Sequence, residues 1–320
     1  MKIFNGKEFF MGKEFYQCGW DLFVERDLLR LSSIAVDEDV SDIGDLTSLA
    51  LIPDDGVGGV SVVVREDVVV AGLMAIPVMF RAIDEDLFWE AESKDEIYDG
   101  KFAVKGKRIG RVAGSVRAVL QAERLLLNLV GRLMGIATLT RKYVDAISGT
   151  AAKIYDTRKT TLGWRRLEKY AVRCGGGQNH RTGLFDAILI KDNHLAFGKE
   201  KTIYNPAEAV CKAKEYLKSR FGQETADTKI VEVEVDNLDQ LSQVLQVKPD
   251  IVLLDNMSPE ILRQAVMMRN NADVAIELEA SGGVRLSTVK AVAATGVERI
   301  SVGALTHSAT SIDIGLDWTE

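Results

Sequence analysis

Six short apolar segments that alternate with helical patterns constrain the fold of this chain most strongly. They occupy residues 152–156, 187–192, 229–236, 251–255, 275–280 and 299–304. Strands separated by helices pair in parallel, because each connection must cross back over the sheet. We therefore expect a C-terminal parallel α/β barrel that is incomplete against the usual eight strands, with about six.

The sequence between these strands contains recognisable signals for the starts of helices. Ser258 followed by Pro259 is a cap followed by the favoured first-turn proline, and Ser287 with Gly296 marks both ends of another helix. These starts place Asp255, Ser281–Gly283 and Gly303 just past the ends of strands. The carboxyl end of a barrel carries the working groups of barrel enzymes.

The N-terminal part has a different period. Apolar spacing predicts helices over 21–36 and 75–83, valine-rich segments at 60–70 and 103–117 predict strands, and the DLTS sequence after Gly44 predicts a turn into extended chain. Strands and helices in this order favour an N-terminal α+β sandwich domain. We place it at 21–129, with 308–320 packing back on it, and the barrel at 130–307.

Residues 1–20 contain a near-repeat, GKEFF and then GKEFY. We interpret this N-terminal extension as flexible chain, with packing on a neighbouring subunit as the alternative.

Composition excludes several classes of protein. The 320 residues are 47% hydrophobic, and the three cysteines (Cys18, Cys174 and Cys211) have no CxxC spacing, which argues against a disulfide framework or a structural zinc and favours a reducing cytoplasm. Neither a signal peptide nor a run of about 20 apolar residues is evident, so we expect no membrane partner.

Residues 156–194 hold the chemistry. They carry eight Lys or Arg against four Asp or Glu, inside a chain with a formal charge of −7. A basic pocket in an acidic protein favours a small anionic substrate over nucleic acid. We select Arg158, Lys159, Arg181 and Lys191 because each lies at a strand end or near a glycine-rich turn, and we interpret Arg165, Arg166 and Lys169 as a solvated helix face.

Three glycines at 175–177 lack the spacing of a dinucleotide fingerprint, so a Rossmann site is not indicated. The glycine-punctuated strands near residue 105 lack the displayed lysine of a carrier domain.

The longest helical pattern covers 121–147 and begins near Arg124. An arginine in a first turn is electrostatically misplaced beside the positive end of the helix dipole, which indicates a purpose other than helix stability. A surface ion pair is the alternative.

Other candidates lie on the expected rim. Backbone N–H groups of Ser281-Gly282-Gly283 and Val302-Gly303-Ala304 are placed to bind a phosphate. Glu234 and Asp255 either hold Mg²⁺, directly or through water, or form a buried network with Lys191 or Arg158. The three histidines, His180, His194 and His307, all fall near this rim, as packing or binding residues, and none has zinc spacing.

The stretch DTRKTTLGWRRLEKYAVRCGGGQNHRTGLFDAILIKDNH closely resembles a signature of the quinolinate phosphoribosyltransferase family, also called nicotinate-nucleotide pyrophosphorylase (carboxylating). The resemblance continues through EDVSDIGDLTSLALIP, AERLLLNLVGRLMGIATLTRKYV, IVEVEVD, IVLLDNMSPE, IELEASGGV and ISVGALTHS, roughly from residue 36 to 318. Leu162 stands where the family commonly has Pro, and Gln178 where it often has His. Both departures bear on the pocket wall.

The resemblance implies a pentosyltransferase of de novo NAD biosynthesis that converts quinolinate and phosphoribosyl pyrophosphate into nicotinate mononucleotide, pyrophosphate and CO₂, with Mg²⁺. It implies a cytoplasmic homodimer, or a hexamer, in which Arg124 reaches the active site of the other subunit. It assigns quinolinate to Arg124, Thr157, Arg158, Lys159, His180 and Arg181. It assigns phosphoribosyl pyrophosphate to Lys191, Glu234, Asp255, Ser281, Gly282, Gly283, Val302, Gly303, Ala304 and His307. The catalytic residues it implies are Lys159, Lys191, Glu234 and Asp255, with the choice of the lysine that assists decarboxylation left open.

Two alternatives remain at this point. A related phosphoribosyltransferase could act on another base, as in a molybdenum-associated homologue, and a non-catalytic regulator could bind only the phosphosugar.

Overall fold

The computed structural model describes residues 3–4, 7–8, 13–93, 95–197 and 204–318. These residues form two compact units that interleave along the chain. The first unit comprises 1–16, 145–158 and 179–302, and the second comprises 17–144, 159–178 and 303–320. We expected residues 159–178 to belong to the barrel at 130–307, whereas in the structure they belong to the second unit. No helix in the described part of the chain is both long and apolar enough to cross a bilayer.

The first unit is built on a parallel sheet of six strands, as expected. Its order is β8-β13-β12-β11-β10-β9, so β8 and β9 are the two edges. The strands are β8 (Lys153–Tyr155), β9 (Ile188–Ile190), β10 (Val231–Val235), β11 (Ile251–Asp255), β12 (Glu277–Ser281) and β13 (Arg299–Ser301). The predicted incomplete barrel is confirmed.

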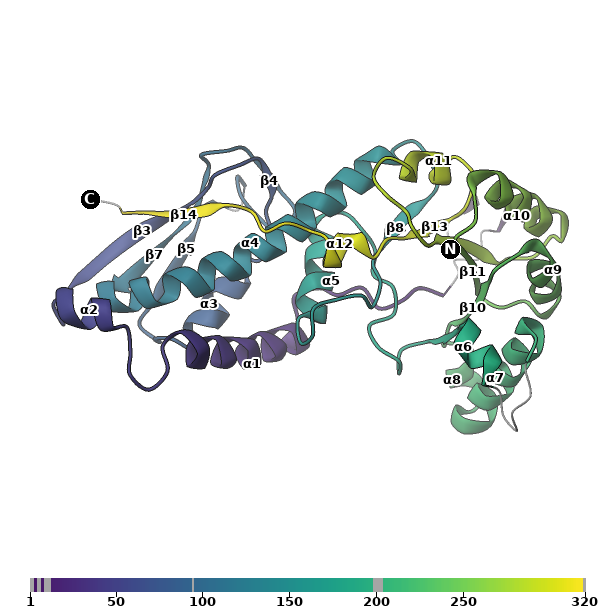
Figure 1. Ribbon diagram of the computed structural model, residues 1–320, viewed down its shortest axis with the longest axis horizontal. Helices are drawn as coiled ribbons and strands as arrows, with labels where there is room; N and C mark the ends of the chain where they lie inside the picture. The colour runs from purple at the N-terminus through teal and green to yellow at the C-terminus, as the bar shows by residue number, and fades with distance from the viewer. Residues whose placement is uncertain (1–2, 5–6, 9–12, 94, 198–203, 319–320) are drawn as a thin grey trace. The chain divides into compact units, whose positions relative to one another are not determined.

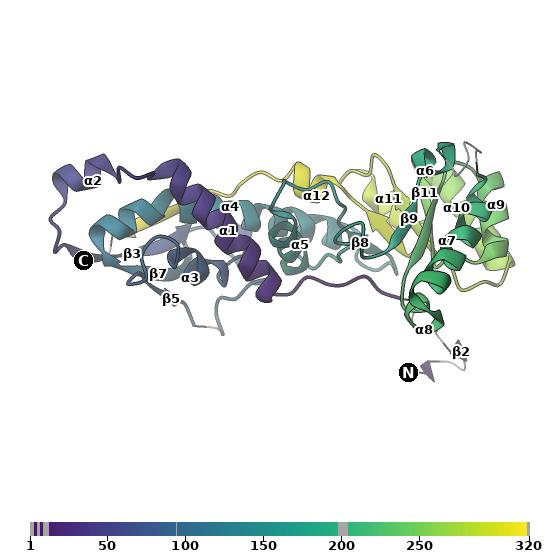
Figure 2. The same ribbon diagram turned by 90° about the horizontal axis from the view of Figure 1, so that it is seen from below.

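Helices cover the outer side of this sheet, as Figure 2 shows for α7, α9 and α10. The helices of the unit are α6 (Asp192–Ala196), α7 (Pro206–Phe221), α8 (Gln223–Ala226), α9 (Leu238–Val247), α10 (Pro259–Asn271) and α11 (Val289–Ala293). Ser258 caps α10 through a hydrogen bond from the N–H of Ile261, as expected. The expected cap at Ser287 is wrong, because α11 starts one residue later and Thr288 makes no side-chain cap.

The second unit holds an antiparallel sheet of order β14-β3-β7-β5, with a separate pair formed by β4 and β6. Figure 1 shows α4 running along this sheet. The strands are β3 (Val57–Val64), β4 (Val68–Val69), β5 (Phe88–Ala91), β6 (Phe102–Ala103), β7 (Arg108–Ser115) and β14 (Ile314–Trp318). The helices are α1 (Leu22–Asp39), α2 (Leu46–Leu51), α3 (Ala75–Phe80), α4 (Val116–Ala146), α5 (Arg165–Cys174) and α12 (Ala304–His307).

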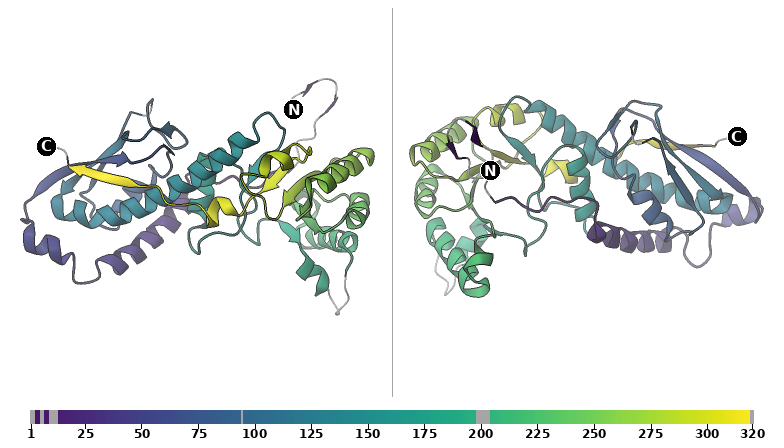
Figure 3. Two further views of the ribbon diagram at one scale, coloured as in Figure 1. Left: turned by 45° about the horizontal axis from the view of Figure 1, so that its top comes forward. Right: turned by 180° about the vertical axis from the view of Figure 1, so that it is seen from behind.

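The C-terminal strand returns to the N-terminal sheet, where β14 pairs antiparallel with β3 (Figure 3). Two glycines of α4 allow the segment before β14 to pass close to the helix backbone. The N–H of Ile312 donates to the carbonyl of Gly131, and a Cβ on Gly135 would lie 2.0 Å from the carbonyl oxygen of Thr310. Only glycine leaves room for this crossing.

Three local expectations for the second unit are wrong. The DLTS segment is not extended, because Asp45 accepts hydrogen bonds from Thr47 and Ser48 and so caps α2. Helix α4 begins at Val116, which removes Arg124 from the first turn and with it the dipole argument. Lys169 is fully buried rather than part of a solvated face.

The extension also differs from the expectation of flexible chain. Ile3–Phe4 and Lys7–Glu8 pair as β1 and β2, and Phe15 and Cys18 are buried. Residues 1–2, 5–6 and 9–12 lie outside the described residues.

Candidate functional site

The inner face of the parallel sheet is set by strand alternation. In β10, Glu232 and Glu234 point to the same side because successive side chains alternate. Glu232 is fully buried, whereas Glu234 and Asp255 lie near the carboxyl ends of their strands and are partly exposed. The sheet therefore offers a buried polar layer and, above it, the rim predicted from the sequence.

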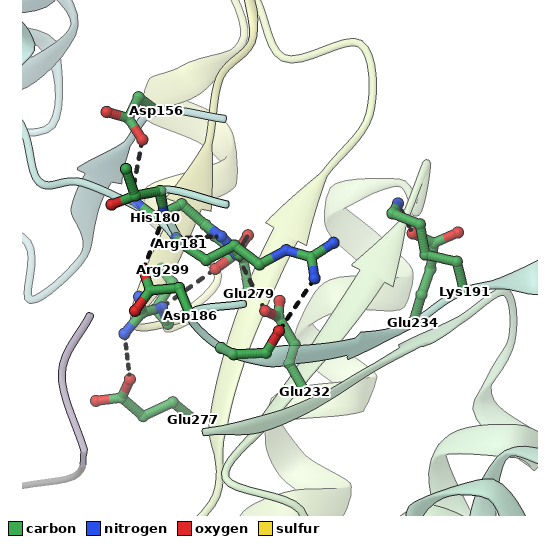
Figure 4. Close-up of polar contacts among 12 residues, drawn as sticks. Asp156, His180, Arg181, Asp186, Lys191, Glu232, Glu234, Glu277, Glu279 and Arg299 are labelled. Atoms are coloured by element: carbon green, nitrogen blue, oxygen red, sulfur yellow. Dashed lines mark hydrogen bonds and ion pairs between the residues drawn. The ribbon is translucent and has the colours of Figure 1, made fainter. Parts of the chain in front are cut away.

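The connection that follows β8 carries the predicted basic residues and is anchored by Asp156. This fully buried carboxylate accepts hydrogen bonds from Asn179 Nδ2 at 2.6 Å and from the backbone N–H of His180 at 2.9 Å (Figure 4). Asp156 directly follows the edge strand β8, and the residues it holds lead into the other edge strand, β9. Asp156 was missed as a site residue, although it is the last residue of the strand predicted at 152–156.

His180 lies inside the unit rather than on an open surface. Its Nδ1 accepts a hydrogen bond from the backbone N–H of Arg181 at 2.8 Å, which places the ring proton on Nε2. Nε2 lies 3.0 Å from Glu232 and 3.5 Å from Glu279. Both ring nitrogens therefore face protein groups, and the assignment of His180 to quinolinate stays a prediction.

Glu232, Glu279 and Arg299 form a charged layer that sequence reasoning missed. Arg299 donates to Glu279 at 3.1 Å and to Glu277 at 2.8 Å, while neither oxygen of Glu232 accepts a hydrogen bond from any described residue. Burial raises the pKa of Glu232 to about 7, against the opposing charge of Arg299. Burial, and then the charge of Glu232, also raises the pKa of Glu279. Burial thus raises the pKa of both carboxyls, and the negative charge of Glu232 adds to the rise at Glu279, so both groups favour their protonated forms more than exposed glutamates do.

A signal for this layer was present in the sequence. Strands of a parallel sheet buried on both faces are normally continuous apolar runs, yet VEVEV and ELEAS place glutamates at every second position. Such an alternation indicates polar groups that point into a barrel.

His180, Glu232 and Glu279 offer three ligand atoms within 4.8 Å of one another. A metal bound there would need the lone pair of Nε2. That nitrogen carries the ring proton while Nδ1 accepts from Arg181, so the residues do not fit a metal ion in this arrangement.

Arg158 and Arg181 form the anion-attracting part of the site. Arg181 is buried and donates to the carbonyl of Ala187 at 3.1 Å. Burial, and then the nearby charge of Arg158, lowers the pKa of Arg181. Arg158 Nε is buried without a hydrogen-bond partner among the described residues. Two neighbouring guanidiniums that still have N–H groups available for hydrogen bonds favour an anion that accepts two of them, such as a carboxylate.

Lys191 and Glu234 form an ion pair to one side of the layer around His180 (Figure 4). Burial raises the pKa of Glu234, the Lys191 ammonium opposes the shift, and the charge of Asp255 adds to it. Asp255 accepts a hydrogen bond from the side chain of Asn256 at 2.6 Å. The structure thus brings together Lys191, Glu234 and Asp255, three of the residues predicted for the phosphosugar.

The two backbone segments predicted to bind phosphate, 281–283 and 302–304, differ in their conformation and hydrogen bonding. Gly282 and Gly283 both have positive φ, at 92° and 61°, and a Cβ on Gly282 would lie 2.2 Å from Asn256 Oδ1. Only glycine suits this turn after β12. In contrast, the N–H of Val302 already donates to the carbonyl of Tyr155 at 2.9 Å, and phosphate binding at Val302 stays a prediction.

Most of the remaining predicted site residues lie in the second unit, where four of them are neighbours and Arg124 is considered by itself. Lys159 and His307 flank Gly303, where a Cβ would lie 3.1 Å from Lys159 Cδ and 3.2 Å from His307 Nε2. Ala304 begins α12 beside them. Arg124 is exposed on α4 and lines an apolar pocket with Trp164. Thr157, in the first unit, is partly exposed between Asp156 and Arg158.

Comparisons with known proteins agree over most of the chain. Residues 45–134 match the family described as quinolinate phosphoribosyl transferase, N-terminal domain, and residues 136–317 match the corresponding C-terminal domain. The nicotinate-nucleotide pyrophosphorylase [carboxylating] of Mycobacterium leprae is 40% identical over 296 residues, covering 91% of this chain and 96% of that protein. A chloroplastic enzyme of the same name from Arabidopsis thaliana is 38% identical and covers 91% of this chain and 82% of that protein.

A solved structure gives the same result. The nicotinate-nucleotide pyrophosphorylase of Francisella tularensis superposes with a TM-score of 0.82 at 36% identity, covering 96% of this chain and 100% of that one.

Proposed function

The chain belongs to the quinolinate phosphoribosyltransferase family, and from that premise we propose how its own residues carry out the reaction. The activity is the decarboxylating transfer of a phosphoribosyl group to quinolinate in NAD biosynthesis. The ring nitrogen of quinolinate bonds to C1 of the ribose, and the C1–O bond to pyrophosphate breaks. The C2–carboxylate bond then breaks to release CO₂, its electron pair stays on ring C2 beside the cationic nitrogen, and C2 takes up a proton to give nicotinate mononucleotide.

The observation that carries this proposal is the pair formed by Arg158 and Arg181. Two guanidiniums that repel each other, one with a buried unpaired Nε, gain most from an anion that bridges them. A pyridine with adjacent carboxylates supplies such an anion. Thr157 and Lys159, which flank Arg158 in the chain, complete the binding of the ring diacid. We keep His180 as a residue that orients Arg181 and contacts the diacid only after a ring movement.

Lys191, Glu234 and Asp255 face the sugar in this proposal. The transition state carries positive charge on the ribose ring, and carboxylates close to it lower its energy. Lys191 neutralises Glu234 in the free protein. When positive charge develops on the ribose ring beside Glu234, it replaces the Lys191 ammonium as the partner of that carboxylate. The Lys191 ammonium is then available to bind the substrate. Either Lys191 or Lys159 then orients the 2-carboxylate as it leaves.

The phosphate monoester is placed at Ser281, Gly282 and Gly283, whose positive-φ glycines turn the backbone after β12. Gly303, Ala304 and His307 add further donors to the phosphosugar. We propose Val302 with this group as well, and in the free protein its N–H donates to the carbonyl of Tyr155.

Mg²⁺ is proposed at Glu234 and Asp255. The donor set fits, since both are carboxylates, the ligand type that Mg²⁺ prefers, and the charge of Asp255 raises the pKa of Glu234 through repulsion that a cation would relieve. When bound, the ion supplies charge neutralisation of the pyrophosphate leaving group. The residues themselves hold the sugar and the diacid in line.

We propose a homodimer, or a hexamer built from it, in which the exposed Arg124 reaches a second copy's diacid. Three free thiols among the described residues suit a cytoplasmic location.

The test is to incubate the purified protein with quinolinate, phosphoribosyl pyrophosphate and Mg²⁺ and to follow CO₂ and pyrophosphate together. Both products should appear in equal amounts and should be lost on chelation of the metal. Turnover of nicotinate without turnover of quinolinate would point instead to a relative with another base. Binding of the phosphosugar without pyrophosphate release would point to a regulator.

The matched variants are Arg181→Ala and Arg263→Ala. Loss of a charge-assisted hydrogen bond of about 1.5–3 kcal/mol raises the KM for quinolinate by about 10- to 100-fold in the first. Arg263 is half exposed on α10, and its replacement should leave both KM values unchanged. An Arg181→Ala protein with an unchanged KM for quinolinate would contradict the proposed diacid site.

A further inference from the structure

The second copy of the N-terminal near-repeat, Lys13–Tyr16, lies at the amino-terminal end of the parallel sheet. Lys13 Nζ donates to the carbonyl of Lys229 at 2.7 Å and contacts Asp250 at 3.1 Å. Glu14 lies 3.6 Å from Lys153 and 3.8 Å from Arg299. These partners stand at or just before the first residues of β8, β10, β11 and β13. The segment therefore covers the mouth opposite the rim.

Phe15 is the part of this segment that enters the unit. It is 4% exposed and clusters with Ala187, Ile230 and Ile251, which lie at the starts of β9, β10 and β11. Its ring stacks on the His180 imidazole, with 4.3 Å between ring centroids and 28° between the planes. The Arg299 guanidinium lies 5.1 Å from the centre of the Phe15 ring.

A chain of contacts connects Phe15 to the substrate side. The stacked ring fixes the plane of the imidazole, and that plane directs Nδ1 at the backbone N–H of Arg181 and Nε2 at Glu232 and Glu279. Rotation of the imidazole about the Cβ–Cγ bond of His180 would break the hydrogen bond that Nδ1 accepts from the backbone N–H of Arg181. Arg181 in turn stands beside Arg158 in the proposed diacid site.

We propose that Phe15 is a positioning residue for the reaction: by stacking on His180 it holds the imidazole that fixes the backbone of Arg181, the residue that binds the diacid. This inference rests on the proposed function of Arg181. It assigns a role to a segment that lies before the residues matched by the two family domains, 45–134 and 136–317.

The aromatic ring, rather than apolar volume alone, is the feature that matters. Leucine in place of Phe15 would still fill the cluster with Ala187, Ile230 and Ile251, but it has no flat face to fix the plane of the imidazole. Phe15→Leu thus separates positioning from simple closure of the mouth. Tyr16→Leu is the matched control, because Tyr16 lies on the same segment and is 49% exposed.

The first measurement is the ¹⁵N NMR spectrum of the histidine side chains in protein labelled at histidine, at fixed pH. Only three histidines contribute, and His194→Gln and His307→Gln samples assign the signals. In the starting protein, His180 should show a bare Nδ1 and a protonated Nε2. In Phe15→Leu these signals should shift toward an average of the two tautomers, while Tyr16→Leu leaves them in place.

The second measurement is the KM for each substrate. An aromatic pair contributes enough that its loss should raise the KM for quinolinate by about 3- to 10-fold in Phe15→Leu. The KM for phosphoribosyl pyrophosphate should stay within about twofold. Unchanged His180 signals would overturn the proposal, and so would an equal rise in both KM values, which indicates a structural role only. If the starting protein fails to turn over quinolinate, the proposed function fails, but the NMR comparison still decides whether Phe15 holds His180.

Discussion

Replacing Glu232 by glutamine should stabilise the protein at alkaline pH and leave it nearly unchanged at acid pH. Glu232 is fully buried, and burial raises its pKa from 4.5 to about 7. A carboxyl that holds its proton more tightly in the folded chain contributes stability below the pKa of the unfolded chain, and this contribution disappears as pH rises through the folded pKa. The contribution of Glu232 to the free energy of unfolding should therefore fall between about pH 4.5 and about pH 7, and the advantage of the glutamine variant should grow over the same range.

The size of the effect follows from the same values. A rise from 4.5 to about 7 corresponds to about 3 kcal/mol at most. Because the charges of Glu232 and Glu279 are coupled, we expect Glu232→Gln to raise the free energy of unfolding by about 1–3 kcal/mol at pH 8 and by less than about 0.5 kcal/mol at pH 4.5. Glutamine keeps an oxygen for Nε2 of His180 and carries no charge to bury.

The assay is urea denaturation followed by circular dichroism at several pH values, with hydrogen exchange of residues 231–235 as a local report on the sheet. Glu215→Gln, on the exposed side of α7, is the control and should follow the starting protein at every pH. Parallel stability curves for Glu232→Gln and the starting protein, or a variant that is less stable at pH 8, would refute the reasoning.

Three further outcomes concern stability and are read from denaturation midpoints. Glu168→Ala should lose about 3–5 kcal/mol, because it leaves Arg132, at 2.7 Å from the buried carboxylate, without its partner, and a smaller loss than about 1 kcal/mol would contradict the pairing. Gly135→Ala should lose about 1–3 kcal/mol despite its better helix propensity, since its Cβ meets the carbonyl of Thr310, and a gain in stability would show that the C-terminal segment does not lie there. Ser258→Ala should lose about 1 kcal/mol through the missing cap of α10, and an unchanged midpoint would exclude that cap.

The strands and helices of the parallel sheet were predictable because their signals are local. Each predicted strand segment overlaps an observed strand, and Ser258 with Pro259 marked the start of α10. The failures were also local in kind. Asp45 was not recognised as a helix cap, and the start of α4 was placed too late, so Arg124 received an argument that the structure removes.

The candidate site was predictable only in part. Residues at or directly after the ends of strands, such as Lys191, Asp255 and Ser281, could be placed on the rim because the ends of parallel strands meet at one edge. His180 was selected for its neighbours in the sequence, yet its ring is turned toward Glu232 and Glu279. No pattern in the sequence indicated that Phe15, distant in the chain, would stack on that ring.

By itself the sequence determined the family, the parallel sheet and the collection of basic residues, since periodicity and motif order are properties of adjacent residues. Only the tertiary structure decided which of these charges are neutralised. Lys191 pairs with Glu234 and Arg299 pairs with Glu279, whereas the positive charge of Arg158 lies close enough to Arg181 to lower its pKa. The physical reason is that the energy of a charge depends on its burial and on its neighbours in space, and residues far apart in the chain supply both.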